Sequence, residues 1–146
     1  MSRATILHVE DDSNDAVLFQ HACRKAGMDV NLQVVADGEE AVAYLQGAEQ
    51  VDNREAHPFP SLVVLDLKLP RVNGFDVLAW MRNEQNLRRL PVIVLTSSSH
   101  QADVTRAYDL GANSFLVKPV AFEALVTLAK GINQYWLSLN QGPVGA

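Results

Sequence analysis

Asp66 is the residue of this chain whose position most clearly requires a chemical explanation. It follows an unbroken apolar run, Leu62-Val63-Val64-Leu65. Such a run is typical of a strand that is buried on both faces of a parallel sheet. Because a carboxylate is costly to bury, we expect Asp66 at the end of this strand, in a crevice, beside groups that pair with it.

Three other predicted strands also end in polar side chains: Glu10-Asp11-Asp12, Thr96-Ser97-Ser98-Ser99 and Lys118-Pro119. In an open doubly wound sheet, ligands bind outside the carboxyl ends of the strands, so these groups should converge on one rim. Neighbouring carboxylates raise one another's pKa unless a cation intervenes. A hard divalent cation meets that need, and Mg²⁺ fits best, with Mn²⁺ as the alternative.

The combination of groups at this rim points to phosphoryl transfer. A metal ion, the Lys118 ammonium and the Thr96 hydroxyl together could neutralise the charge on the equatorial oxygens of a transferring phosphoryl group. Asp66 is then the natural nucleophile, and its product is an aspartyl phosphate.

The elements that must position these groups are strands and helices that alternate five times. The predicted strands cover residues 4–9, 31–36, 61–65, 91–95 and 114–117. Alternation of this kind predicts an α/β fold, a five-stranded doubly wound parallel sheet with helices on both faces and right-handed crossovers. The first helix should bury Val17, Leu18, Ala22 and Ala26, and a long C-terminal helix should run from Phe122 to Leu139.

Composition limits the classes of function. The 146 residues amount to about one domain, their net charge is −5, and no basic cluster stands out, so nucleic-acid binding is not expected. No apolar run approaches the ~20 residues of a membrane span and no signal peptide is apparent, so we expect a cytoplasmic protein. Cys23 is the single cysteine, which excludes an intrachain disulfide and favours a buried, inert thiol.

Four segments in this order resemble the receiver domain of two-component response regulators. They are Val9-Glu10-Asp11-Asp12, then residues 64–74 (Val-Leu-Asp-Leu-Lys-Leu-Pro-x-x-Asn-Gly), then Leu95-Thr96-Ser97, and residues 111–119 (Gly-Ala-Asn-x-Phe-Leu-Val-Lys-Pro). The resemblance covers about residues 4 to 135 and is highly specific, because each motif falls at the expected strand end. It implies a flavodoxin-like fold with strand order 2-1-3-4-5.

The resemblance also implies a role for each rim residue. Asp66 would accept a phosphoryl group from a histidine kinase. Asp11 would ligate Mg²⁺ directly, Glu10 would act through water, and the Lys68 backbone carbonyl would be a further ligand. Thr96 and Lys118 would bind the phosphoryl oxygens.

Two further roles concern the neighbourhood of strand 114–117. Phe115 occupies the aromatic switch position, although it could equally be a plain core residue. The peptide bond between Lys118 and Pro119 would be cis, an expectation that depends on the resemblance alone. Such a protein would phosphorylate and dephosphorylate itself and would turn over no external substrate.

Residues 1–140 are expected to form the receiver domain, followed by a flexible tail, 141–146, with no output domain, so the signal should leave by protein contact. The long loop at 47–60, the stand-alone length and Ile132-x-x-Tyr135-Trp136-Leu137 more narrowly resemble single-domain regulators that are paired with phytochrome-type kinases. The output face would comprise helix 101–110, strand 114–117 and the last helix. A homodimer through this face is expected, in which Trp136 or Leu137 joins Val104 and Tyr108. The alternative is that the edge of the last helix only covers its own core.

Two other classes of function stay open. Haloacid-dehalogenase-type phosphohydrolases also use an Asp nucleophile, but they need a second Asp two residues later, where this chain has Lys68. The other class is a phosphorylation-independent adaptor, and the complete set of rim residues argues against it. Lys68 and Ser98 border the path of a hydrolytic water, so either side chain could alter the lifetime of an aspartyl phosphate.

Overall fold

A five-stranded parallel sheet forms the centre of the protein, as the alternation of elements predicts. The structure is a computed structural model, and it describes residues 3–50 and 55–143. The strands pair in the order β2-β1-β3-β4-β5, and every neighbouring pair is parallel, so the predicted fold class and strand order are confirmed. Their bounds are β1 Ala4–Val9, β2 Val30–Val35, β3 Leu62–Leu65, β4 Val92–Thr96 and β5 Ser114–Val117.

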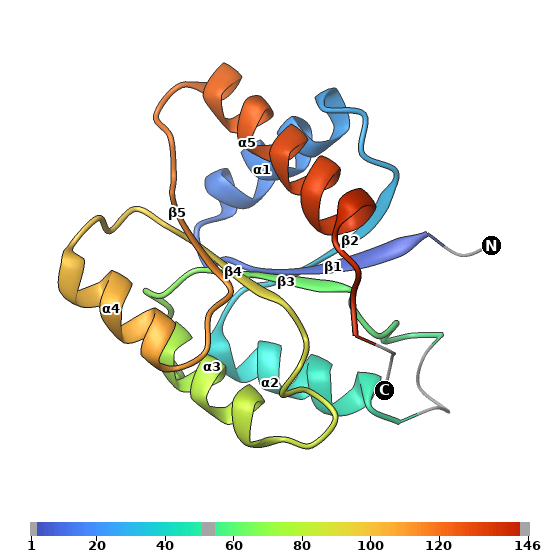
Figure 1. Cartoon of the computed structure of the whole chain (residues 1–146), viewed down its shortest axis with the longest axis vertical. Coiled ribbons are helices and arrows are strands. Elements are labelled where there is room, and N and C mark those ends of the chain that lie inside the picture. Colours follow the sequence, from blue (N-terminus) through green and yellow to red (C-terminus); the bar gives the residue numbers. More distant parts are fainter. Residues whose placement is uncertain (1–2, 51–54, 144–146) are drawn as a thin grey trace.

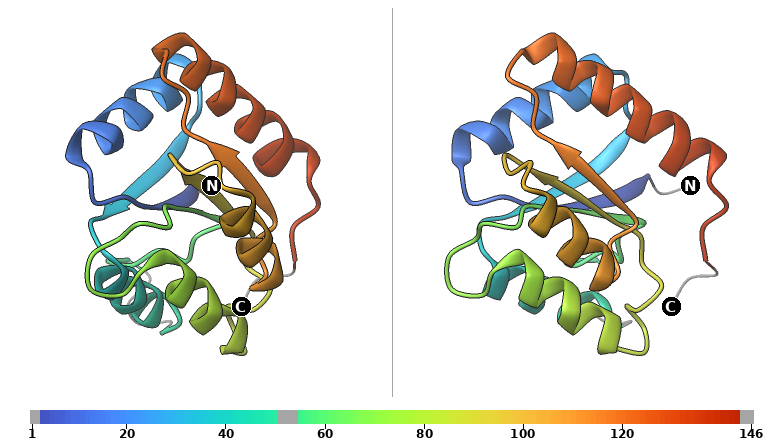
Figure 2. Two further views of the ribbon diagram at one scale, coloured as in Figure 1. Left: turned by 90° about the vertical axis from the view of Figure 1, so that its left-hand side faces the viewer. Right: turned by 60° about the vertical axis from the view of Figure 1, so that its left-hand side comes forward.

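Helices cover both faces of this sheet. Helices α1 (Ser13–Lys25) and α5 (Phe122–Gln134) pack together on one face. Helices α2 (Gly38–Ala48), α3 (Gly74–Asn83) and α4 (Gln101–Asp109) cover the other, and Figures 1 and 2 show these two layers on opposite sides of the strands. The carboxyl ends of the strands therefore meet the starts of the helices along one rim of the sheet.

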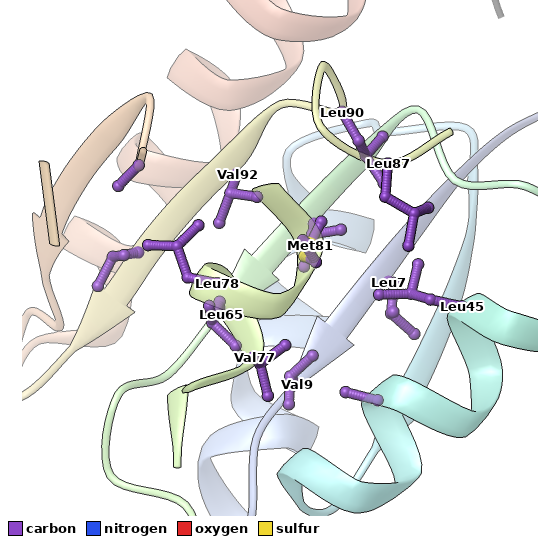
Figure 3. Packing of buried hydrophobic residues seen from close by; sticks show 14 of the residues in the cluster. Leu7, Val9, Leu45, Leu65, Val77, Leu78, Met81, Leu87, Leu90 and Val92 are labelled. Atoms are coloured by element: carbon purple, nitrogen blue, oxygen red, sulfur yellow. The ribbon is translucent and has the colours of Figure 1, made fainter. Parts of the chain in front are cut away.

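The core is divided by the sheet into two hydrophobic clusters. Because successive side chains of a strand point to opposite faces, Leu7 and Val9 pack toward α2 and α3, whereas Ile6 packs toward α1 and α5. Figure 3 shows the first cluster, in which Met81 of α3 lies among residues of β1, β3 and β4. Strands β3 and β4 are buried along their whole length, which explains their unbroken apolar sequences.

Helix α1 buries a different face from the one that its apolar residues predict. Val17 is 49% exposed and Leu18 is 45% exposed. The buried residues of α1 are instead Ala16, Phe19, Ala22 and Cys23. Of the predicted residues Ala22 is buried, and it shares with Phe19 and Cys23 the cluster between α1 and α5, whereas the side chains at positions 17 and 18 lie toward solvent.

The C-terminal helix is present, but it is not a continuous α-helix from Phe122 to Leu139. After Gln134 it continues as a π-helical turn, η2 (Tyr135–Leu139), in which the Asn140 N–H donates to the Tyr135 carbonyl over 2.6 Å. A π turn accommodates an extra residue, so it rotates the helix face that follows. The predicted core residue Leu139 is therefore 70% exposed.

Two predicted irregular segments are only partly described. Helix α2 extends into the predicted 47–60 loop as far as Ala48, and residues 51–54 lie outside the described part of the chain. Residues 144–146 of the predicted tail also lie outside it. Within residues 3–50 and 55–143, none of the helices has the length and apolar character needed to cross a membrane.

Candidate functional site

The predicted rim residues do converge at the carboxyl ends of β1, β3, β4 and β5. Backbone hydrogen bonds set their register: the Glu10 N–H donates to Val35, the Asp66 N–H to Val9, and the Lys118 N–H to Thr96. Glu10, Asp66 and Lys118 thus continue the hydrogen-bonding pattern of the sheet one residue past the end of their own strands. Glu10, Asp66 and Thr96 are all buried, which is uncommon for such side chains unless they are paired or functional.

The Lys118 ammonium lies between three carboxylates. Its Nζ is 2.6 Å from Glu10 Oε1, 2.8 Å from Asp15 Oδ2 and 2.9 Å from Asp66 Oδ2. Burial alone would lower the pKa of Lys118, but the bonds to Asp15, Asp66 and Glu10 outweigh burial and raise it. The ammonium is therefore charged at any physiological pH.

Glu10, Asp11 and Asp66 form an acidic cluster that fits a divalent cation. One carboxylate oxygen from each of the three lies within 4.8 Å of the others. Burial raises the pKa of Glu10 to about 7, although the Lys118 ammonium, 2.6 Å from its Oε1, acts to lower it. A divalent cation would add to this effect and favour the ionised carboxylate, as oxygen-rich Mg²⁺ and Mn²⁺ sites do.

Asp66 is held as an ionised carboxylate in spite of its burial. Burial acts to raise its pKa, but the hydrogen bond and charge of Lys118 outweigh this effect, so the pKa is lowered. The Lys68 N–H also donates to Asp66 Oδ1 over 3.3 Å. An ionised oxygen in a largely water-excluded crevice is the form that a nucleophile requires.

The Thr96 hydroxyl is fully buried beside this carboxylate, and it forms no hydrogen bond with any residue in the described ranges. The same hydroxyl acts to lower the pKa of Asp66. A buried hydroxyl without a partner costs free energy, about 1–3 kcal/mol. A ligand oxygen in the crevice would remove that cost.

Phe115 and Ser98 lie on the α4 side of the rim. Phe115 pairs in register with Val94 and packs, half-buried, against the cluster that includes α3 and α4. The Ser98 hydroxyl is buried and donates to Asp103 Oδ2 over 2.5 Å, which closes the first turn of α4 onto the end of β4. Sequence reasoning placed Ser98 beside the site but did not predict this bond.

The segment after Asp66 is fixed at both ends by close backbone contacts. A Cβ atom on Gly74 would lie 2.2 Å from the Asp66 carbonyl oxygen, and one on Gly38 would lie 1.7 Å from the Val72 carbonyl oxygen. Arg71 has a φ of 66° and forms ion pairs with Asp37 and Glu39 of the α2 start. These contacts hold the loop that carries the predicted Lys68 carbonyl ligand.

One expectation about the Lys118 region needs correction, and one residue of the site was not predicted. The peptide bond between Lys118 and Pro119 is not cis, since the described residues contain no cis peptide bond. X-Pro bonds ordinarily prefer the trans form by about 0.5–1 kcal/mol. With this bond in trans, Lys118 contacts all three carboxylates. Asp15 of α1 also belongs to the site, because its carboxylate contacts Lys118. Sequence reasoning missed it, since an acidic residue in the first turn of a helix is common and indicates no particular function.

Two further buried titratable groups, His8 and Cys23, lie on the α1 side of the sheet. Burial lowers the pKa of His8 to about 4, and its ring packs against Phe19 with centroids 4.6 Å apart. Cys23 is buried as predicted, with 3% exposed, and burial raises the pKa of its thiol to about 12, which disfavours the reactive thiolate. Neither group has the exposure that a phosphorelay donor or a redox sensor requires.

The fold and the rim together define a doubly wound α/β protein with an acidic cluster that fits a divalent cation beside a buried, ionised aspartate. Residues 6–130 match the family model of the response regulator receiver domain, and the chain belongs to this family. Phosphorylation by a kinase is the general mechanism of the family, whose members act in signalling and do not turn over an external substrate.

Curated relatives cover most of the chain. Response regulator Rcp1 of Synechocystis is 37% identical over 132 residues, which is 90% of this chain and 88% of that protein. The probable methanogenesis regulatory protein FilR2 of Methanothrix harundinacea is 37% identical over 138 residues, or 94% of this chain and 86% of that protein. This chain is similar to both along nearly its entire length.

Solved structures of receiver proteins are also similar. The Mn²⁺-bound form of Rcp1 superposes with a TM-score of 0.83 at 36% identity, covering 97% of this chain and 99% of that one. The phosphorylated cyanobacterial phytochrome response regulator RcpA superposes with a TM-score of 0.87 at 34% identity, covering 98% of this chain and 100% of that one. The metal in the Rcp1 structure agrees with the acidic cluster of Glu10, Asp11 and Asp66.

Proposed function

We propose that this protein is a response regulator that accepts a phosphoryl group on Asp66 from a histidine kinase, in an Mg²⁺-dependent reaction. The observation that carries the proposal is the convergence on one ionised carboxylate of a lysine ammonium at 2.9 Å, two further carboxylates and an unpartnered buried hydroxyl. Each of these groups has a task in phosphoryl transfer, and few other reactions need all of them.

In this mechanism Asp66 attacks the phosphorus of a phosphohistidine. The new bond joins an Asp66 carboxylate oxygen to phosphorus, the P–N bond breaks, and the imidazole nitrogen of the kinase takes up a proton. A bound Mg²⁺ supplies neutralising charge and would be held by Asp11, by Asp66, by Glu10 through water, and by the Lys68 carbonyl. Lys118 and Thr96 donate hydrogen bonds to the phosphoryl oxygens. Hydrolysis of the acyl phosphate by water returns Asp66 to its initial state.

A phosphorylation assay tests this function directly. Incubation with Mg²⁺ and acetyl phosphate, or with a phosphorylated kinase from the same genome, should add one phosphoryl group, as measured by intact-protein mass spectrometry. Asp66→Asn should abolish the addition, because an amide is not a nucleophile of this kind.

An Asp76→Asn variant is the matched control. Asp76 is an exposed first-turn carboxylate of α3, so this variant should be phosphorylated like the wild type. Chelation of the metal should stop the reaction in both proteins. If the wild type stays unmodified with every donor and Mg²⁺, the phosphorylation-independent adaptor becomes the better reading.

We further propose a phytochrome-type kinase as the donor. The support is the similarity to RcpA, which is described as a phytochrome response regulator. A reducing cytoplasm is the proposed location, and the buried free thiol of Cys23 is compatible with it. Protein partners fit better than nucleic acid, because the chain carries a net charge of −5.

The proposed output face comprises α4, β5 and α5. A phosphoryl group would draw the Thr96 hydroxyl toward it, and this movement would open space for Phe115, which lies on the adjacent strand. The C-terminal end of α4 is fixed, because the Arg82 guanidinium donates to the Gly111 carbonyl and to Asn113 Oδ1. The shift would therefore be concentrated at the first turn of α4, where Ser98 bonds to Asp103.

Exposed apolar side chains on this face support a homodimer. Tyr108 of α4 is 48% exposed, Val117 of β5 is 45% exposed and Tyr135 of η2 is 51% exposed. We expect sedimentation to detect a dimer, and Val117→Asp should weaken it at least tenfold by placing charges in the contact. Val34→Asp on the β2 edge is the control and should leave the mass unchanged. A protein that stays monomeric at high concentration, with and without a phosphoryl mimic, would contradict this proposal.

A further inference from the structure

The Lys118 ammonium has three N–H groups, and three carboxylates surround it. Two of these carboxylates, Glu10 and Asp66, also belong to the acidic cluster that fits a metal ion. The third, Asp15, does not belong to that cluster. Asp15 is also the most accessible of the three, with a side chain that is 39% exposed, compared with 1% for Glu10 and 7% for Asp66.

This arrangement creates a competition between two cations. A divalent cation can bind the cluster only if Glu10 and Asp66 share their negative charge between the metal and Lys118. The half-buried Lys118 ammonium loses favourable interactions if its carboxylates turn to the metal, and it also repels the incoming metal. A carboxylate that pairs only with Lys118 would reduce both the loss of partners and the repulsion of the metal.

We propose that Asp15 is a positioning residue, which holds and neutralises the Lys118 ammonium so that Glu10 and Asp66 can accept the metal ion. The inference rests on the proposed metal-dependent function, which assigns no role to Asp15. Lys118 keeps one carboxylate partner throughout, and its other two N–H groups become available to the phosphoryl oxygens.

The first turn of α1 connects Asp15 to the metal cluster. The Asp15 N–H donates to Asp12 Oδ1 over 3.1 Å, and the Asp12 N–H donates to Glu10 Oε2 over 3.2 Å. The helix start thus fixes Asp15 relative to Glu10, and both reach Lys118 from one continuous piece of chain. The competing explanation is that Asp15 only stabilises the N-terminus of α1 through the helix dipole.

Calorimetric titration of Mg²⁺ into the metal-free protein separates these explanations. Asp15→Asn should weaken Mg²⁺ binding by about fivefold, because an uncompensated ammonium stays beside the cluster in a partly screened setting. Asp15→Glu should recover most of the affinity. Asp76→Asn removes a first-turn carboxylate from α3 and should bind Mg²⁺ like the wild type.

A double-mutant cycle tests whether Asp15 acts through Lys118. In a Lys118→Met background, Asp15→Asn should change the Mg²⁺ affinity by less than twofold, because the ammonium that Asp15 serves is gone. The same fivefold effect in both backgrounds would show that Asp15 acts only as a nearby negative charge, and no effect in either would also overturn the proposal. The titration requires no phosphorylation, so its result stands apart from the outcome of the phosphoryl-transfer assay.

Discussion

Replacing Gly74 by alanine should destabilise the protein by about 3 kcal/mol, because a new side chain would be forced against rigid backbone. A Cβ atom at this position would lie 2.2 Å from the Asp66 carbonyl oxygen and 2.6 Å from the Leu67 Cα atom. Neither is the end of a flexible side chain, so the start of α3 or the strand end at Asp66 must move. Displacement of Asp66 should also weaken metal binding.

Gly131→Ala is the matched control, and it should change the free energy of unfolding in the opposite direction. Gly131 lies within α5, and a Cβ atom there would meet nothing within 4 Å. Alanine is favoured over glycine in a helix, so a gain of about 0.5–1 kcal/mol is expected. Urea unfolding of both variants measures these changes as shifts of the midpoint at constant slope. A Gly74→Ala protein as stable as the wild type would show that the close approach is not tight.

Replacing Lys118 by methionine should destabilise the metal-free protein by about 3 kcal/mol, because three carboxylates lose the cation between them. Lys118 lowers the pKa of Asp66, so this pairing stabilises the fold above the ordinary pKa of an aspartate and is lost as the pH falls. The difference between wild type and variant should therefore be largest near neutral pH and shrink in acid.

Addition of Mg²⁺ should restore much of the lost stability in Lys118→Met, since the metal replaces the missing cation. The variant should also bind Mg²⁺ more tightly than the wild type, while it loses efficient phosphorylation. Lys25→Met is the control: its ion pair with Glu123 is exposed on both sides, and such a pair contributes about 0–1 kcal/mol. Equal stability losses for the two lysine variants would contradict the central role of Lys118.

The contrast between Asp66 and α1 shows what sequence patterns can predict. Asp66, Thr96 and Lys118 were found because each directly follows a strongly apolar strand, and parallel strands deliver their ends to one rim. The buried face of α1 was predicted only in part. Ala22 is buried as expected, but Val17 and Leu18 are exposed, because the packing of α1 against α5 and the sheet buries Phe19 and Cys23.

The trans bond before Pro119 and the π turn at η2 were beyond sequence reasoning for a similar reason. Both are choices between local conformations that differ by little free energy, so the surrounding packing decides them. The sequence alone determined the alternation of strands and helices and the chemical groups at the strand ends, because these follow from apolar patterning and chain direction. The strand order was implied by the resemblance to receiver domains.

Only the tertiary structure decided how those groups share their charges. It brought Asp15 of α1 to Lys118, 103 residues away in the chain, and thereby gave the ammonium a carboxylate outside the metal cluster. Within the described residues it also left the Thr96 hydroxyl buried and without a hydrogen-bond partner beside Asp66. Distances of 2–3 Å between side chains from different elements depend on how helices pack on the sheet, and no local pattern in the sequence encodes that packing.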